Sequence, residues 1–94
     1  MKKIDNNTVE GEGFKVKCIL PFQLYYYEGD KVIRFGVENA SSGISIYFTK
    51  PKWGLDYSVD WLNDEEKSRV KERVSKALDL LKIKYHFDTN ESPY

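Results

Sequence analysis

The stretch LYYYEGDKVIRF, residues 24–35, predicts a β-hairpin and thereby decides the kind of fold. Gly29-Asp30 has the composition of a two-residue turn with glycine at its first central position. The residues on both sides are mostly aromatic or β-branched, and such side chains suit a pleated, half-buried surface. A turn at this place pairs Glu28 with Lys31, which are opposite charges directly across the two strands.

The same register determines which side chains share a face of the hairpin. It pairs Tyr27 with Val32, Tyr26 with Ile33, Tyr25 with Arg34 and Leu24 with Phe35. We assign one face, with Leu24, Tyr26, Ile33 and Phe35, to the core, and the other, with Tyr25, Tyr27, Val32 and Arg34, to the outside. A slip of one residue would exchange the two faces, so the prediction depends on the register.

Three further segments alternate between apolar and polar residues with the period of a strand. We expect the following side chains to point inward: Phe14, Val16 and Cys18; Ile44, Ile46 and Phe48; and Ile83, Tyr85 and Phe87. Their neighbours Lys15, Lys17, Ser45, Tyr47, Thr49, Lys84 and His86 would then point outward. Each of these segments is therefore predicted to be a half-buried strand.

One amphipathic helix follows Asn63, which is a suitable N-cap with Glu66 as its capping-box partner. The acidic residues 64–66 would fill the first turn, where the helix dipole favours negative charge. The apolar residues recur at helical spacing on a single stripe, namely Val70, Val74, Ala77, Leu78 and Leu81. Two ion pairs at a spacing of four residues are expected on the helix, Glu65–Arg69 and Glu72–Lys76.

The order of these elements is β-β-β-β-α-β, which predicts an α+β fold. We expect a mainly antiparallel sheet of about five strands, with the helix packed on one of its faces. Residues 1–94 are interpreted as a single domain, in which residues 1–12 and 88–94 are frayed ends.

Charge and cysteine content limit the possible functions. Fifteen basic and fifteen acidic residues give a net charge of zero, which argues against bulk electrostatic capture of nucleic acid or of an anionic membrane. Cys18 is the single cysteine, so an intrachain disulfide is impossible, and we interpret it as a buried strand residue. The sequence has no signal peptide and no membrane-spanning segment, so a cytoplasmic location is expected.

Motifs for catalysis are missing, and we expect neither an enzyme nor a cofactor. No glycine-rich phosphate loop precedes a helix, and no paired Cys or Cys/His motif is present. His86 is the only histidine, and no signature places a nucleophile beside it. The rival interpretation is a small hydrolase or nuclease that holds Mg²⁺ with Asp56, Asp60 and Glu65. Helix capping and solvation explain these acids equally well.

Trp53 and Trp61 lie in the connection between the last central strand and the helix. In one interpretation they close the end of the core, where a buried tryptophan needs a partner for its N–H. In the other they flank an exposed acidic loop and dock a protein partner, because tryptophan is enriched at interface hot spots. We expect Trp61, beside the helix cap, to belong to the core. Both interpretations stay open for Trp53.

The outer face of the sheet is rich in tyrosine. It would carry Tyr25, Tyr27 and Tyr47 together with Lys15, Lys17 and Arg34. Three interpretations compete for this face: a solvated surface, a self-association surface and a platform for single-stranded nucleic acid. We rank them in that order, because tyrosine is also a good strand former and the strands lack the aromatic motif of RNA-recognition sheets.

The C-terminal half resembles small bacterial α+β proteins grouped with predicted immunity proteins of polymorphic toxin systems. In these proteins, too, a GxIxIY strand is followed by a tryptophan, an acidic helix start, an amphipathic helix and a last strand. The corresponding elements here are residues 43–47, Trp53, residues 64–66 and residues 83–87. The resemblance implies a non-enzymatic cytoplasmic protein that binds another protein.

These observations together predict a protein-binding module. The predicted docking residues are Trp53, Asp56, Asp60 and Trp61. An aromatic anchor with an acidic rim suits a basic partner such as a nucleic-acid-cleaving toxin. The balanced charge and the tyrosine-rich face also favour a homodimer, formed through the sheet face or an open sheet edge. The alternative function is a single-stranded nucleic-acid-binding domain that uses Tyr25, Tyr27, Tyr47, Lys15 and Arg34.

Overall fold

The computed structural model describes residues 1–19, 23–40, 43–55 and 60–88 of the chain. Within these ranges it contains one helix and seven strands. In chain order these are β1 (Lys2–Asp5), β2 (Thr8–Gly11), β3 (Phe14–Ile19), β4 (Gln23–Glu28), β5 (Lys31–Ala40), β6 (Gly43–Tyr47), α1 (Asp64–Leu80) and β7 (Tyr85–Asp88).

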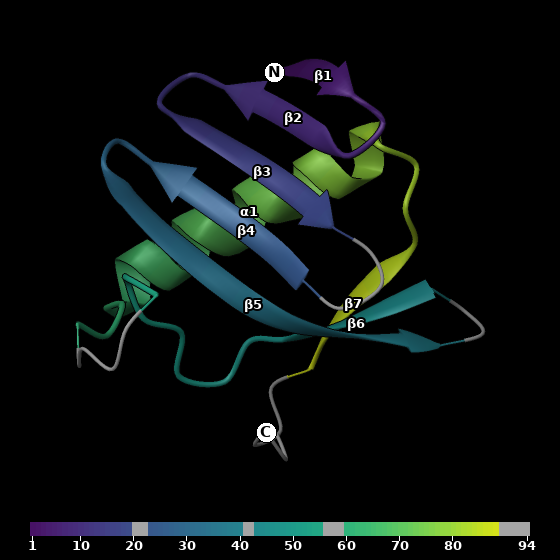
Figure 1. Cartoon of the computed structure of the whole chain (residues 1–94). Helices are drawn as coiled ribbons and strands as arrows, with labels where there is room; N and C mark the ends of the chain where they lie inside the picture. The colour runs from purple at the N-terminus through teal and green to yellow at the C-terminus, as the bar shows by residue number, and fades with distance from the viewer. Residues whose placement is uncertain (20–22, 41–42, 56–59, 89–94) are drawn as a thin grey trace.

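All seven strands belong to one sheet, in which they follow one another in chain order (Figure 1). Neighbours up to β6 are antiparallel, whereas β6 and β7 are parallel because α1 lies between them in the chain. The long strand β5 joins two parts of the sheet. Its first residues, up to Gly36, pair with β4, and its last residues, from Val37, pair with β6.

The predicted α+β class is confirmed, but the sheet has seven strands rather than about five. The two additional strands are β1 and β2, which form a hairpin within the segment that we expected to be frayed. Neither strand has a clear alternating pattern, because every residue of β1 is exposed and β2 places only Val9 in the apolar core. Residues 89–94 lie outside the described part of the chain.

The central hairpin has the predicted register. Each expected pair between β4 and β5 occurs, from Leu24 with Phe35 to Glu28 with Lys31. Gly29 has a φ of 62°, so glycine suits the turn that the sequence indicates. As predicted, Leu24, Tyr26, Ile33 and Phe35 are buried.

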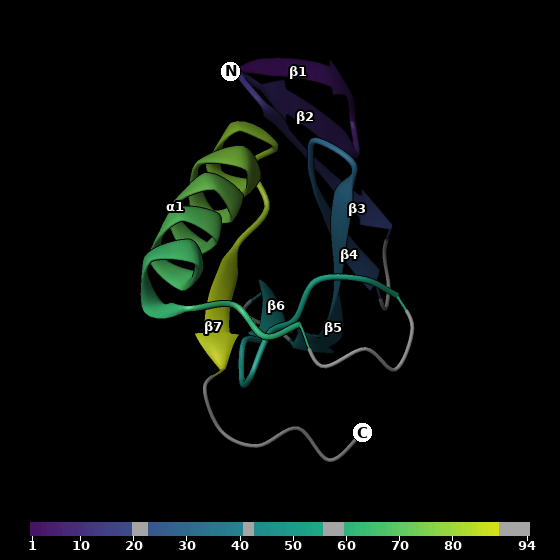
Figure 2. The same ribbon diagram turned by 90° about the vertical axis from the view of Figure 1, so that its left-hand side faces the viewer.

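Helix α1 covers one face of the sheet, as Figure 2 shows from the side. Val70, Val74, Ala77 and Leu78 are fully buried, and Leu81 is nearly so. The sheet contributes fully buried side chains from four strands to the same core, namely Val9, Val16, Cys18, Leu24, Tyr26 and Ile46. This apolar layer removes large aliphatic side chains from water on both sides, which is the main source of stability in such a fold.

Two arginines also fix the helix to the end of β4. Arg69 donates from Nη2 to Glu28 Oε2 at 3.0 Å, while its Nε faces Oε1 at 3.0 Å as an ion pair. Arg73 donates from Nη1 to Glu28 Oε1 at 3.1 Å and to the Tyr26 hydroxyl at 3.0 Å. The predicted pair of Glu72 with Lys76 is present. Arg69 reaches across to the sheet instead of along the helix, so its expected pairing with Glu65 is not the contact that forms.

Gly43 allows β6 and β7 to approach each other. Its φ is 129°, and a Cβ placed on it would lie 2.4 Å from the carbonyl oxygen of Lys84. The Ile44 N–H donates to that same carbonyl at 2.9 Å. A side chain at position 43 would therefore break the start of the parallel strand pair.

Lys82 ends the helix in a conformation that glycine usually supplies. Its φ is 59°, in the left-handed region. The Ile83 N–H donates to the Leu78 carbonyl at 3.0 Å, and the Lys82 N–H donates to the Asp79 carbonyl at 3.1 Å. These two bonds form a Schellman motif with Lys82 at the position after the C-cap.

The substitution Leu78→Ala tests the packing of the helix. Because Leu78 is fully buried, we expect a loss of roughly 2–5 kcal/mol in the free energy of unfolding. Leu80→Ala is the matched control on the same helix, since Leu80 is 41% exposed and should cost less than about 0.5 kcal/mol. Urea denaturation of both variants measures the difference, and equal losses would show that the buried stripe is assigned wrongly.

Lys82→Gly should stabilise the protein, by roughly 0.5–1 kcal/mol, because it relieves the left-handed backbone at the helix end. Lys71→Gly is a control for which we expect the opposite sign. It places a glycine in the middle of the same helix and should lower the free energy of unfolding by roughly 1 kcal/mol. The midpoint temperature of thermal unfolding should therefore rise for Lys82→Gly and fall for Lys71→Gly. A decrease for both variants would contradict the conformation described for Lys82.

Candidate docking surface

The connection between β6 and α1 is tied together by its own backbone. The Trp53 N–H donates to the Asp60 carbonyl at 2.9 Å, and the Leu62 N–H donates to the Pro51 carbonyl at 3.1 Å. The two ends of the connection therefore run antiparallel beside each other. The Gly54 N–H also donates to the Val32 carbonyl at 2.7 Å, which attaches the connection to β5.

Trp53 belongs to the core, and only 3% of it is exposed. Its ring lies 6.3 Å from that of Tyr26, and its Nε1 donates to Glu66 Oε2 at 3.1 Å. The ammonium group of Lys31 lies 5.1 Å from the centre of the indole ring. Of the two interpretations that the sequence left open for Trp53, the structure supports the core. Its buried ring cannot be the anchor of a docking surface.

The expectation that Trp61 is a core residue is wrong, because its side chain is 52% exposed. Trp61 lies opposite Lys52 in an isolated antiparallel bridge, and the next residue, Leu62, is buried. Adjacent residues in extended chain point to opposite sides. Since Leu62 takes the inward position beside the helix start, Trp61 must point outward.

A shallow hollow of about 360 Å³ lies beside Trp61. Its lining residues are Lys50, Pro51, Trp61, Leu62 and Lys67. Leu55 belongs to the same connection and is 53% exposed. The connection therefore exposes two large apolar side chains, and the hollow beside Trp61 is bordered by Lys50 of the connection and Lys67 of α1.

The acids that we predicted for a docking rim have different positions. Asp60 is exposed, next to Trp61. Asp64 is also exposed, in the first helical turn, and Lys67 approaches it to 4.0 Å. Asp56 lies outside the described residues.

Glu66 joins the helix cap to the tryptophan connection. Its Oε1 accepts the Asn63 N–H at 3.0 Å, and its N–H donates to the Asn63 side chain at 2.8 Å, which completes the predicted capping box. The hydrogen bond from the Asn63 backbone lowers the pKa of Glu66, and the bond from Trp53 acts in the same direction. The same carboxylate therefore positions both the helix start and the buried indole.

The residues of the alternative nucleic-acid face do come together, on the side of the sheet away from α1. Tyr25 and Tyr27 stack with ring centres 6.2 Å apart, and the ammonium group of Lys15 lies 4.9 Å from the centre of the Tyr27 ring. Arg34 is exposed and pairs with Tyr25 across the strands. Tyr47 lies on β6, where its hydroxyl donates to the Glu38 carboxylate.

The single cysteine lies in the core. Cys18 is fully buried on β3, as predicted, and burial raises the pKa of its thiol. His86 is exposed on β7. Within the described ranges, no three or more His, Cys, Asp or Glu side chains form a group that could hold a metal ion. The one helix found there is not long and apolar enough to cross a membrane.

Comparison with known proteins gives no relative. No protein-family model, no curated protein and no solved structure matches the chain significantly. The resemblance to immunity proteins therefore stays a prediction, and any functional conclusion has to come from the residues of this chain.

Glu66→Gln tests the electrostatic role of Glu66 through pH. A lowered pKa means that its carboxylate stabilises the folded state above the unfolded pKa of about 4.3, and that this stabilisation is lost as the pH falls through the folded pKa. The difference in unfolding free energy between wild type and Glu66→Gln should therefore shrink as the pH falls from 7 to about 3.

Glu65→Gln is the control, because it removes a neighbouring carboxylate from the same helical turn. Denaturant unfolding at several pH values should show a larger pH-dependent difference for Glu66→Gln than for Glu65→Gln. The lowered pKa values of Asp5 and Glu72 are shared by all three proteins and cancel in the comparison. Parallel curves for both variants would contradict this role of Glu66.

Proposed function

We propose that the chain is a non-enzymatic protein-binding module that docks its partner through a surface centred on Trp61. This Trp61 surface consists of Trp61 and the residues that line the hollow beside it, namely Lys50, Pro51, Leu62 and Lys67. The observation that carries the proposal is the exposure of about half of Trp61, at 52%, next to a hollow. Leu55, elsewhere on the same connection, is equally exposed. A partner that covers such residues gains binding free energy, because apolar surface is removed from contact with water.

The composition of the Trp61 surface suits an interface. Tryptophan is among the residues that contribute most to binding, and it acts best when a partner side chain fills the space beside it. Here the hollow between Trp61, Pro51 and Lys67 offers that space. The charged groups around it include both signs, since Lys67 approaches Asp64 to 4.0 Å and Asp60 precedes Trp61 in the chain. These charges would contribute more to the orientation of the partner than to its affinity.

The support beneath the Trp61 surface is another argument for docking. Trp53 and Leu62 are buried under the connection, and its two ends are hydrogen-bonded to each other. A surface that is held in place before binding loses less conformational entropy when the partner arrives. Trp53 thus contributes as the support of the surface, and not as one of the docking residues that the sequence predicted.

A toxin is the partner class that we propose to test first. The C-terminal half of the chain resembles immunity proteins, whose function is to bind a toxin. The partner would insert an apolar side chain into the hollow beside Trp61. In this proposal, the function needs no nucleophile, metal or cofactor.

Site-specific crosslinking tests the Trp61 surface directly. A photoreactive phenylalanine analogue at position 61 should crosslink one defined protein in the native cell, and the same analogue at Leu80, which is 41% exposed on the helix, should not. The crosslinked protein is then purified and its affinity for the wild type, Trp61→Ala and Leu80→Ala is measured. Loss of a tryptophan hot spot typically costs at least 2 kcal/mol, so we expect affinity to fall by about 30-fold or more for Trp61→Ala alone.

Two results would contradict the proposal. One is a partner that binds the wild type and Trp61→Ala equally well, which would place docking elsewhere. The other is equal crosslinking from positions 61 and 80, which would show non-specific capture. Circular dichroism of both variants checks that the fold is intact.

A further inference from the structure

The outer face of the central strands has a charge pattern that differs from the rest of the chain. On β3, β4 and the first half of β5, all of which the structure describes, the outward positions hold three cations and no acid. These cations are Lys15, Lys17 and Arg34, and all three are exposed. The zero net charge of the whole chain therefore conceals a local positive strip.

Strand register places these cations next to tyrosines. Lys17 pairs with Tyr25, and Tyr25 pairs with Arg34, so one row across the three strands runs cation, ring, cation. In the next row, Lys15 pairs with Tyr27. The two rings stack on each other along β4, at 6.2 Å between centres and 21° between planes. Tyr25 therefore lies between two cations, whereas Tyr27 lies between Lys15 and Val32, with Glu10 of β2 on the far side of Lys15.

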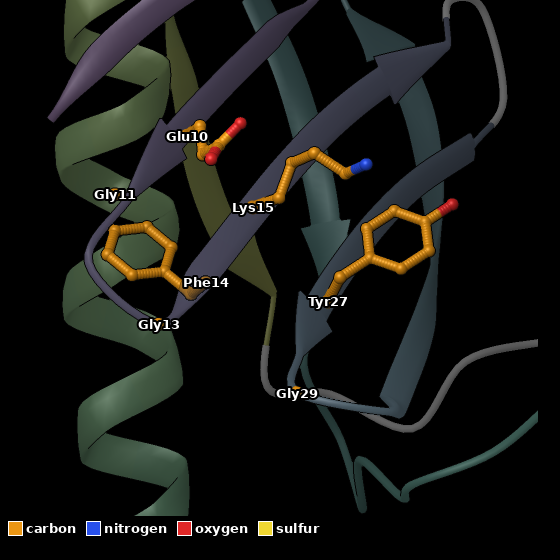
Figure 3. A pocket seen from close by; sticks show the side chains of 7 residues that line it. All are labelled: Glu10, Gly11, Gly13, Phe14, Lys15, Tyr27 and Gly29. Carbon is orange, nitrogen blue, oxygen red and sulfur yellow. The ribbon is translucent and has the colours of Figure 1, made fainter.

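A hollow continues this face toward the hairpin ends (Figure 3). It has a volume of about 370 Å³ and is lined by Glu10, Gly11, Gly13, Phe14, Lys15, Tyr27 and Gly29. In Figure 3, Lys15 and Tyr27 project from neighbouring strands on the same side of the sheet. The three glycines have no side chains to fill the space. A planar group stacked on Tyr27 therefore has room to extend into this hollow.

A second copy of the chain is a poor occupant of this face. In a symmetric dimer the same surface meets itself, so Lys15, Lys17 and Arg34 would lie against their own copies. Like charges brought together in this way oppose association. A polyanion with flat rings suits the face better, because its phosphates meet the cations and its bases meet the tyrosines.

We propose that this tyrosine face, formed by Lys15, Lys17, Tyr25, Tyr27 and Arg34, binds single-stranded nucleic acid. The phosphates lie along the cations, and successive bases stack on Tyr25 and Tyr27. Duplexes are excluded because their bases are already stacked inside the helix and cannot reach the rings. Stacking on a tyrosine ring accepts any base, so binding should depend little on sequence. This inference is independent of the Trp61 surface, which uses other residues.

Fluorescence anisotropy with labelled single strands of DNA and RNA tests the inference. Binding should weaken with salt, with a slope of log K against log salt of about −2, from three phosphate contacts at about 0.7 each. A duplex of the same length should bind far more weakly. Tyr25→Ala should lower the affinity by about 5-fold to 150-fold, as expected for one stacked base. Tyr25→Leu keeps the bulk of the side chain and serves where the alanine variant is unstable.

The charge pattern provides a matched control. Lys15→Gln/Lys17→Gln removes two cations from the tyrosine face, and Lys71→Gln/Lys76→Gln removes two exposed cations from α1, on the other side of the sheet. Both double variants change the net charge equally. The first should reduce the magnitude of the salt slope by about 1.4, and the second should leave it unchanged.

Three outcomes would overturn the inference. These are no binding of either single strand at low salt, equal effects of the two double variants, and a duplex bound as tightly as the single strands. A dimer that dissociates in Lys15→Gln/Lys17→Gln, with no oligonucleotide bound, would assign the face to a second copy instead. Preference for RNA over DNA would indicate contacts to the 2′-hydroxyl.

Discussion

The fold depends on the burial of one apolar stripe of α1 against one face of the sheet. The stripe has the period of a helix and the sheet face has the period of a strand, so the two surfaces can be matched only when the helix lies across several strands. The fully buried residues on both sides, such as Val74 and Leu78 against Tyr26 and Ile46, form this layer. The other interactions of the helix fix its position on the sheet: the cap at Asn63, the arginine contacts to Glu28 and the turn at Lys82.

Local signals in the sequence were sufficient for the central elements. The hairpin register and the capping box depend on residues close together in the chain, and both occur as predicted. The expected burial of alternate residues holds for Val16 and Cys18 and for Ile44 and Ile46, whereas Phe14, Ile83, Tyr85 and Phe87 are only partly buried. The last strand is Tyr85–Asp88 and not residues 83–87. The first hairpin was not predicted because β1 buries none of its residues and leaves no pattern. The partner of Arg69 was also not predictable from the helix alone. Glu28 is distant in sequence and becomes the better partner only when the sheet brings it, partly shielded from water, to the helix.

The positions of the two tryptophans show the same limit within the candidate site, because Trp53 was left open and Trp61 was wrongly expected in the core. Composition indicated that the connection carries aromatic residues, but not which of them turns inward. That choice depends on the pairing of the connection with itself, which puts Leu62 and Trp53 on the inner side and Trp61 on the outer side. It also depends on Glu66, which already serves the helix cap and has a second oxygen that accepts the Trp53 N–H. A buried indole needs such an acceptor, and that acceptor lies at position 66.

A net charge of zero is a weak guide to local electrostatics in this chain. Several of its acids are engaged within the fold: Glu28 with two arginines, Glu66 with the cap and Trp53, and Glu72 with Lys76. These contacts lie on the helix side of the sheet. The central strands present Lys15, Lys17 and Arg34 on the other side. Across the sheet they lie at most two strand spacings of roughly 5 Å apart, a distance comparable to the screening length of roughly 8–10 Å, so their fields partly add. The two faces of the sheet therefore differ in charge although the totals balance. Helix α1 covers only one of the two faces of the sheet. The uncovered face has to be stable in water, and it is open to a ligand.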